Sequence, residues 1–289
     1  MTATAQAHRV SGASGGRQRV NQIIRYGGLT LLTILWLIPF LAAILTAFRT
    51  QADIIQYGFW TIPTSLTLEN FGRAWVRAGV SKYLVNSFII TIPALFAMLF
   101  LSSLSAYALA RFKFRGNLAI YFMYVAGTML PFQILMLPVF RLTNELGLYN
   151  TYGSLILIHT AFQLGFCTFV LRNFMRSVPQ DILDAGRVDG CSEFRIYWQI
   201  MIPLSLPSLA ALATLEFTWV FNDYLWAIIL IQTDSLKPVT AGLSTLQGQY
   251  VTDWPLITAG ALLATLPTLL VFVFLQRYFI QGLTLGSGK

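Results

Sequence analysis

Four side chains in one apolar run could bind a polar solute. Glu216, Trp219, Asp223 and Trp226 are three, four and three residues apart, and Asn222 lies beside them. This spacing predicts one face of a helix. A carboxylate inside a membrane helix costs roughly 2.5–3.5 kcal/mol on insertion scales, so it usually faces the bundle interior or an aqueous cavity. Alternating indoles and oxygens suit a sugar, because its C–H face can lie on an aromatic ring while its hydroxyls bond to carboxylate or amide.

Three further polar residues occur at comparable depth in other apolar runs. They are Gln133, His159 and Gln163, and the last two are four residues apart, on one helix face. We expect all three to line the same solute path. The alternative is that these polar groups only bond one helix to another or lie at the aromatic belt of the membrane.

The sequence contains no pattern typical of an enzyme, a metal site or a nucleotide site. His8 and His159 have no catalytic or metal-ligand pattern around them. The closing Gly-Lys dipeptide lacks the first glycine and the Ser or Thr of a P-loop. We therefore expect a chain that is not an enzyme and holds no cofactor and no metal, so that any energy comes from a partner.

The composition is typical of a membrane protein. Of the 289 residues, 56% are hydrophobic and 10% are charged, which excludes a soluble globule with a polar surface. A net charge of +8 could suggest nucleic acid, but the basic residues are scattered between apolar runs. We expect an all-α integral membrane protein that contacts lipid and does not bind nucleic acid.

Six apolar runs are long enough to cross a bilayer as helices. They cover residues 26–48, 83–110, 117–140, 152–174, 204–231 and 257–280. Prolines inside them suit a transport path, because neighbours or a water-filled cavity can satisfy the freed carbonyls. The first run is too long for a cleavable signal peptide and should remain as an anchor. We expect residues 26–282 to form the membrane domain, with a flexible cytoplasmic tail over 1–25 and a short one over 283–289.

The basic residues predict the orientation of the chain. With both termini inside, 13 of the 19 Lys and Arg residues lie on the cytoplasmic side and 6 on the outer side, as the positive-inside rule expects. The outer loop from 49 to 82 has little to fold on its own. We expect it to form a short lid or an edge against a partner.

This orientation makes the patterned polar segment 177–203 cytoplasmic. Ser177 and Gln180 predict a capping box that starts a helix. Gly190 can take a positive φ and end that helix, and Ser192 can cap a second one. A proline at the end of the segment should bend the chain into the next apolar run. Two short helices with a sharp turn would protrude as a docking element.

The segment resembles the EAA signature of permease subunits of bacterial ABC importers. The matching residues are Asp184, Ala185, Gly186, Asp189, Gly190, Phe194 and Pro203. Asp184 replaces the usual Glu and Gly186 the second Ala, which keeps the charge and the small size. In that family the segment is the coupling helix that docks on a separate ATPase. A generic amphipathic hairpin is the alternative.

The run FNDYLW and the ending LQRYFIQGLTLGSGK are similar to those of the maltose-type sugar permeases. The resemblance implies a six-helix subunit in the inner membrane of a bacterium. A second related permease, two ATPase subunits that bind ATP and Mg, and an extracytoplasmic solute-binding protein would be its partners. It also implies that Gln281, Gly282 and Thr284 approach the ATPase. Two other classes stay open: a lipid-modifying enzyme, and an ion-coupled carrier that uses Glu216 and Asp223.

Overall fold

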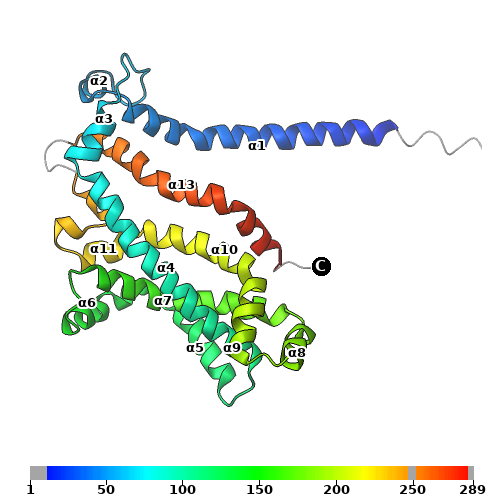
Figure 1. Ribbon diagram of the computed structural model, residues 1–289. Coiled ribbons are helices and arrows are strands. Elements are labelled where there is room, and N and C mark those ends of the chain that lie inside the picture. The colour runs from blue at the N-terminus through cyan, green and yellow to red at the C-terminus, as the bar shows by residue number, and fades with distance from the viewer. Residues whose placement is uncertain (1–11, 247–251, 286–289) are drawn as a thin grey trace, which may run out of the picture.

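The computed structural model describes residues 12–246 and 252–285, and every regular element within them is helical (Figure 1). The five long helices are α1 (Gly12–Ala47), α4 (Val80–Arg111), α7 (Tyr152–Ser177), α10 (Ile202–Phe221) and α13 (Trp254–Leu285). The shorter ones are α2 (Gln51–Tyr57), α3 (Glu69–Gly72), α5 (Asn117–Met129), α6 (Met136–Glu145), α8 (Gln180–Val188), α9 (Glu193–Ile196), α11 (Leu225–Leu230) and α12 (Val239–Ser244). The expected all-α fold is confirmed.

Five helices in the described part of the chain are long and apolar enough to cross a membrane. A sixth crossing is possible if the bent pair Asn117–Met129 and Phe132–Glu145 counts as one span, and these two parts meet at 92°. The prediction of one helix over 117–140 is therefore wrong. Leu130 has an extended backbone, and Pro131 after it has no N–H to continue the helical hydrogen bonds.

The fifth apolar run also breaks. α10 ends at Phe221, and three residues separate it from α11. Within this break the Asp223 carboxylate accepts hydrogen bonds from the backbone N–H groups of Trp226 (3.4 Å) and Ala227 (3.2 Å). It thereby satisfies donors at the start of a new helix. The prediction of a continuous helix over 204–231 is wrong at this point.

α1 is longer and more exposed than the sequence indicated. It begins at Gly12, so residues 12–25 continue the helix where we expected a flexible tail, and residues 1–11 lie outside the described part. Its apolar part, Asn21–Ala47, packs mainly against α13 and buries none of its most apolar stretch. Figure 1 shows α1 extending away from the other helices. Such an apolar surface has to be covered by lipid or by another chain.

The remaining long helices form a bundle around α4. The most extensive helix contact is between α4 and α7, and α10 packs on both. The main core lies among these three helices and includes Met98, Leu171 and Leu212. Figure 1 places α8, α9 and the end of α13 towards one end of the bundle, and α2, α3, α6 and α11 towards the other. The segment 177–203 and the end of α13, both of which we expected on the cytoplasmic side, thus lie towards the same end of the bundle.

Candidate functional site

The segment 177–203 forms helices joined by a tight turn, but its first helix begins differently from the prediction. Ser177 is the last residue of α7, and its hydroxyl donates to the Phe174 carbonyl at 2.7 Å. Pro179 directly precedes α8, and no side chain caps that helix. The predicted capping box is therefore wrong. Val178 before the proline is extended, and this conformation separates α7 from α8.

The turn between α8 and α9 agrees with the prediction. Gly190 has a φ of 77°, which residues with a side chain rarely adopt. The Ser192 Oγ accepts a hydrogen bond from the backbone N–H of Arg195 at 3.3 Å. The second helix is longer than expected, because α9 continues through a π-helical turn, Tyr197–Met201, into α10. Figure 1 shows the run changing direction between α9 and α10. Pro203 is the second residue of α10.

Arg187 holds the two helices together. Its guanidinium contacts the carboxylates of Asp184 in α8 at 2.5 Å and of Glu193 in α9 at 2.7 Å. Hydrogen bonds from Gln180 and Arg187 lower the pKa of Asp184, while those to Glu193 and Asp184 raise the pKa of Arg187. Both Asp184 and Arg187 are therefore charged at neutral pH. We infer that α8, the turn and α9 behave as one unit.

The predicted docking residues divide into an exposed edge and a buried support. The exposed ones are Asp184, Ala185, Asp189, Gly190, Phe194 and Pro203. Gly186 is buried, and a Cβ atom added to it would lie 2.8 Å from the Cδ1 atom of Ile200. Near the turn, Val188 and Phe194 are 88% and 68% exposed. A well-held edge with exposed apolar side chains is suited to binding another protein.

The predicted C-terminal contact residues lie at the end of α13. Gln281, Gly282 and Thr284 belong to its last turns, and their side chains are outside the described residues. Their approach to a partner stays a prediction. The tail expected from residue 283 begins later, since α13 continues to Leu285 and residues 286–289 are not described.

Glu216 and Trp219 do not share one surface of α10. Glu216 is 1% exposed, and its Oε1 lies 3.7 Å from the Cys167 sulfur of α7. Trp219, almost one turn further on, is 61% exposed. With the helix ending at Phe221, Asp223 is not on it at all. The prediction of a single lined helix face is therefore wrong, because Glu216 faces α7 while Trp219 faces outward.

Asp223 and His159 do come together. The Nε2 atom of His159 in α7 lies 3.6 Å from the Asp223 Oδ2 atom, and His159 is buried. Ser87 and Thr91 of α4 line a cavity of about 10 Å³ beside this pair. A cavity of this size holds about one water molecule. The arrangement connects the break after α10 to α4 and α7, and it has no room for a sugar.

The other residues expected on the solute path have separate environments. Trp226 is buried, with its ring 5.3 Å from that of Phe162 and 6.3 Å from that of Phe132. Asn222 is exposed and donates to the Thr218 carbonyl at 2.8 Å. The remaining two are Gln133, which is exposed just after the break that follows α5, and Gln163, which is half-buried in α7. Trp219, Asn222 and Gln133 are thus the members of the set that face outward.

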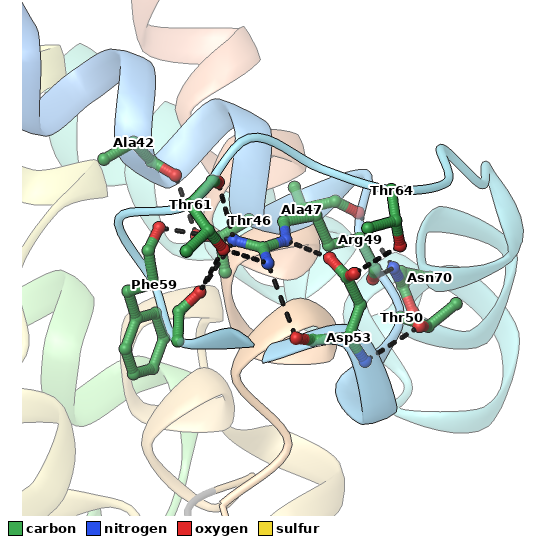
Figure 2. A network of polar contacts seen from close by, with 11 residues as sticks. Ala42, Thr46, Ala47, Arg49, Thr50, Asp53, Phe59, Thr61, Thr64 and Asn70 are labelled. Atoms are coloured by element: carbon green, nitrogen blue, oxygen red, sulfur yellow. Dashed lines mark hydrogen bonds and ion pairs between the residues drawn. The ribbon is translucent and has the colours of Figure 1, made fainter. Parts of the chain in front are cut away.

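The outer loop, residues 49–82, contains a buried polar network that its sequence pattern did not reveal. Arg49 is 1% exposed and donates to the Asp53 carboxylate and to the carbonyls of Phe59 and Thr61, each at 3.3 Å. Figure 2 shows these groups converging on the guanidinium. The expectation that this loop has little to fold is wrong. An arginine with five fixed donors can organise several backbone carbonyls at once.

Over residues 98–285 the sequence matches the family model described as binding-protein-dependent transport system inner membrane component. It is 35% identical over 270 residues to the osmoprotective compounds uptake permease protein GgtD of Synechocystis, covering 90% of this chain and 91% of that one. It is 35% identical over 265 residues to the arabinooligosaccharides transport system permease protein AraQ of Halalkalibacterium halodurans (91% and 94% covered). It is 30% identical over 281 residues to the diacetylchitobiose uptake system permease protein NgcG of Streptomyces coelicolor (96% and 93%).

Solved structures share the fold. A chain of a bacterial ABC transporter involved in the import of the acidic polysaccharide alginate superposes with a TM-score of 0.82 at 20% identity, covering 91% of this chain and 98% of that one. A chain of the MetNI methionine ABC transporter in inward-facing conformations gives a TM-score of 0.55 at 16% identity, with 73% and 98% covered. These similarities confirm the importer-permease fold that the motif resemblance implied.

Proposed function

The chain belongs to the family of binding-protein-dependent transport system inner membrane components, and from this we propose that it forms half of the membrane passage of an ATP-driven importer for a sugar or oligosaccharide. The observation that carries the proposal is the exposed edge of α8 and α9, held by Arg187 and carrying Phe194. ATP binding by a partner would move this edge, and the helices attached to it would switch the passage from inward to outward access. Hydrolysis would reset them.

We assign two of the partners to surfaces that the described residues leave exposed, the α8–α9 edge and α1. An ATPase that binds ATP and Mg docks on the α8–α9 edge, and its second copy serves the other half of the transporter. A second, related permease covers part of α1, whose Trp36 is 73% exposed. A solute-binding protein delivers the solute from outside. The protein lies in the bacterial inner membrane with both termini in the cytoplasm.

The solute class rests on the relatives and on the outward-facing polar residues. The names of two relatives specify arabinooligosaccharides and diacetylchitobiose, both carbohydrates. In this chain the Trp219 indole and the Asn222 amide are exposed close together at the end of α10. An aromatic face beside a hydrogen-bonding amide fits a sugar ring. We propose that these two residues, with Gln133, line the passage.

The docking proposal is tested by purifying the assembled complex from cells that express the whole transporter. Phe194→Ala and Val188→Asp remove apolar contact from the α8–α9 edge, where the described residues leave both side chains mostly exposed. Losing one central apolar contact typically costs about 1–2 kcal/mol, or roughly 5–30-fold in ATPase affinity. Val76→Asp is the matched control, because Val76 is 75% exposed in the outer loop.

Loss of the ATPase with the α8–α9 variants but not with Val76→Asp would support the proposal. Like Val76→Asp, Gly190→Asn should keep the ATPase, since asparagine tolerates a positive φ and no atom of the described residues lies within 4 Å of the added Cβ. Binding that is unaffected by both edge variants would contradict the docking site. Uptake by the purified chain alone, driven by an ion gradient, would instead establish the carrier alternative.

The solute path is tested by Trp219→Ala and Trp219→Phe in vesicles with the full transporter. Alanine removes the aromatic face and should lower uptake of the transported sugar at least about fivefold, whereas phenylalanine keeps a ring and should restore most of it. Assembly is measured in parallel by co-purification. Equal uptake by all three proteins would remove Trp219 from the passage.

A further inference from the structure

Three polar residues on the inner part of α4 face the segment 177–203. Ser103, Tyr107 and Arg111 follow one another at intervals of four residues, which places them on one side of the helix. Each of them bonds to a different part of the segment. α4 therefore contacts the segment at three separate points, although the helix and the segment are far apart in the sequence.

The first two contacts are made by buried hydroxyl groups. The Ser103 Oγ and Tyr197 Oη atoms are 2.7 Å apart, and both residues are buried. The Tyr107 hydroxyl donates to the Glu193 Oε2 atom at 2.9 Å. The rings of Tyr107 and Tyr197 also pack with centroids 5.3 Å apart. Because a buried hydroxyl without a partner is unfavourable, these contacts should hold α4 against α9 and the π-helical turn that follows it.

Arg111 makes the third contact, at the junction of α7 and α8. Its Nη2 group donates to the carbonyls of Met175 and Val178, the latter at 2.8 Å, and its Nη1 group donates to the Gln180 side chain at 3.2 Å. Carbonyls at the end of α7 and a side chain at the start of α8 are thereby fixed to the same arginine.

The outer end of α4 makes a second set of polar contacts. The Tyr83 hydroxyl donates to the Asp234 carboxylate at 2.9 Å. The Asn86 amide donates to the carbonyls of Ser235 and Lys237, both at 2.9 Å. We call the residues from 234 to 244, which include α12, the outer segment. One helix thus holds the docking segment at its inner end and the outer segment at its outer end.

We propose that α4 transmits movement between the docking edge and the outer segment, with Tyr107 and Asn86 as positioning residues at its two ends. This inference rests on the proposed function. α4 runs without interruption over 32 residues, which at about 1.5 Å per residue is long enough to cross the membrane. α10 is joined to α9 by the π-helical turn, but it ends at Phe221, before the outer segment.

The polar contacts continue from α4 to the exposed edge. Glu193, which accepts from Tyr107, also pairs with Arg187 at 2.7 Å, and Arg187 pairs with Asp184. A displacement of α8 is therefore passed to α4 through the guanidinium that both carboxylates contact and through the Tyr107 hydroxyl. Removing the Tyr107 hydroxyl would break this series at one point and leave the ion pairs of the edge in place.

The test uses the complete transporter in vesicles and measures solute molecules taken up per ATP hydrolysed. Tyr107→Phe removes one buried hydrogen bond and should lower this ratio about fivefold. Asn86→Leu removes three, with Ser235, Lys237 and Tyr152, and should lower the ratio at least as much. Tyr124→Phe in α5 is the matched control, because its hydroxyl lies 3.3 Å from the Ser105 Oγ of α4 and, among the described residues, bonds to neither segment. Ser103→Ala is a second inner-end variant should Tyr107→Phe assemble poorly.

If both ends of α4 belong to one connection, the double variant Tyr107→Phe/Asn86→Leu should lower the ratio of uptake to hydrolysis no further than either single variant does. Non-additive effects of this kind mark coupled positions. An unchanged ratio in Tyr107→Phe and Ser103→Ala, an equal fall in Tyr124→Phe, or full additivity of the two ends would overturn the inference. ATPase binding to each variant is measured alongside. Absence of that binding in the wild-type protein would refute the proposed function itself, and normal binding with an unchanged ratio would refute only the role of α4.

Discussion

Replacing Gly186 with alanine tests how closely α8 packs on the helix that leads into α10. The added Cβ atom would lie 2.8 Å from the Ile200 Cδ1 atom, where ordinary contact begins at 3.4 Å. Overpacking of this kind costs about 1–3 kcal/mol. Alanine in a helix interior gains about 1 kcal/mol over glycine. Because Ile200 is only half-buried and can rotate away, we expect a net loss of about 0–1 kcal/mol.

The effect of Gly186→Ala on the free energy of unfolding should change sign when Ile200 is shortened. Ile200→Val removes the Cδ1 atom and by itself costs about 0.5–1.5 kcal/mol. The next atom, on Ile196, lies 3.5 Å from the new Cβ, an ordinary contact distance. In the Ile200→Val background, Gly186→Ala should therefore stabilise by about 1 kcal/mol, which corresponds to a melting temperature about 2–4 °C higher. The two positions are thus coupled by about 1–2 kcal/mol.

The two cysteines provide the assay. Cys167 is fully buried and Cys191 is half-buried, so a Cys191→Ser background leaves one thiol that reacts only on unfolding. A maleimide that becomes fluorescent on reaction then reports the unfolding temperature of each purified variant. Gly186→Ala should lower this temperature or leave it unchanged, and should raise it in the presence of Ile200→Val. An equal effect in both backgrounds would refute the packing argument.

Two further predictions concern the outer half of the molecule. Gly242→Ala would place a Cβ atom 2.2 Å from the Tyr83 ring, so we expect a loss of at least about 3 kcal/mol in thermal unfolding, whereas Gly127→Ala, with no neighbour within 4 Å, should be neutral or slightly stabilising. The hydrogen bond from Thr64 is the main cause that lowers the pKa of Asp53. The stability that Asp53 contributes is therefore present above its unfolded pKa of about 3.9 and disappears as the pH falls through the lower folded value. The difference in unfolding temperature between the wild-type protein and Asp53→Asn should accordingly vanish on acidification, and a difference that persists would contradict this.

The features predicted correctly are those that local chemistry decides. Glycine is the residue that most readily takes a positive φ, so Gly190 marked the turn, and a serine before a polar helix start marked Ser192 as a cap. Long apolar runs marked the membrane helices in the same way. The capping-box prediction at Ser177 was wrong because a serine at the end of a helix can also donate to a carbonyl of the preceding turn.

The features predicted incorrectly depend on contacts between distant or competing groups. Apolar periodicity continues through Asp223, so only the hydrogen bonds of its carboxylate to the next helix show that the helix has ended. Arg49 counted as one more basic residue of an outer loop, and its partners include backbone carbonyls that no sequence pattern marks. The one-face prediction for residues 216–226 fails because the capping hydrogen bonds of Asp223 follow an interruption of the helix, and because Glu216 and Trp219 already face different ways within α10.

The burial of the intramembrane polar residues bears on where the passage lies. Glu216 and His159 are turned towards neighbouring helices of the same chain, and the cavity beside His159 holds about one water molecule. Trp219 and Asn222, in contrast, face away from the bundle. A solute that meets this chain in the membrane therefore meets its surface, which forms one wall only. On the proposed path, the second permease would supply the opposite wall. The apolar surface that α1 leaves exposed has to be covered by this second permease or by lipid.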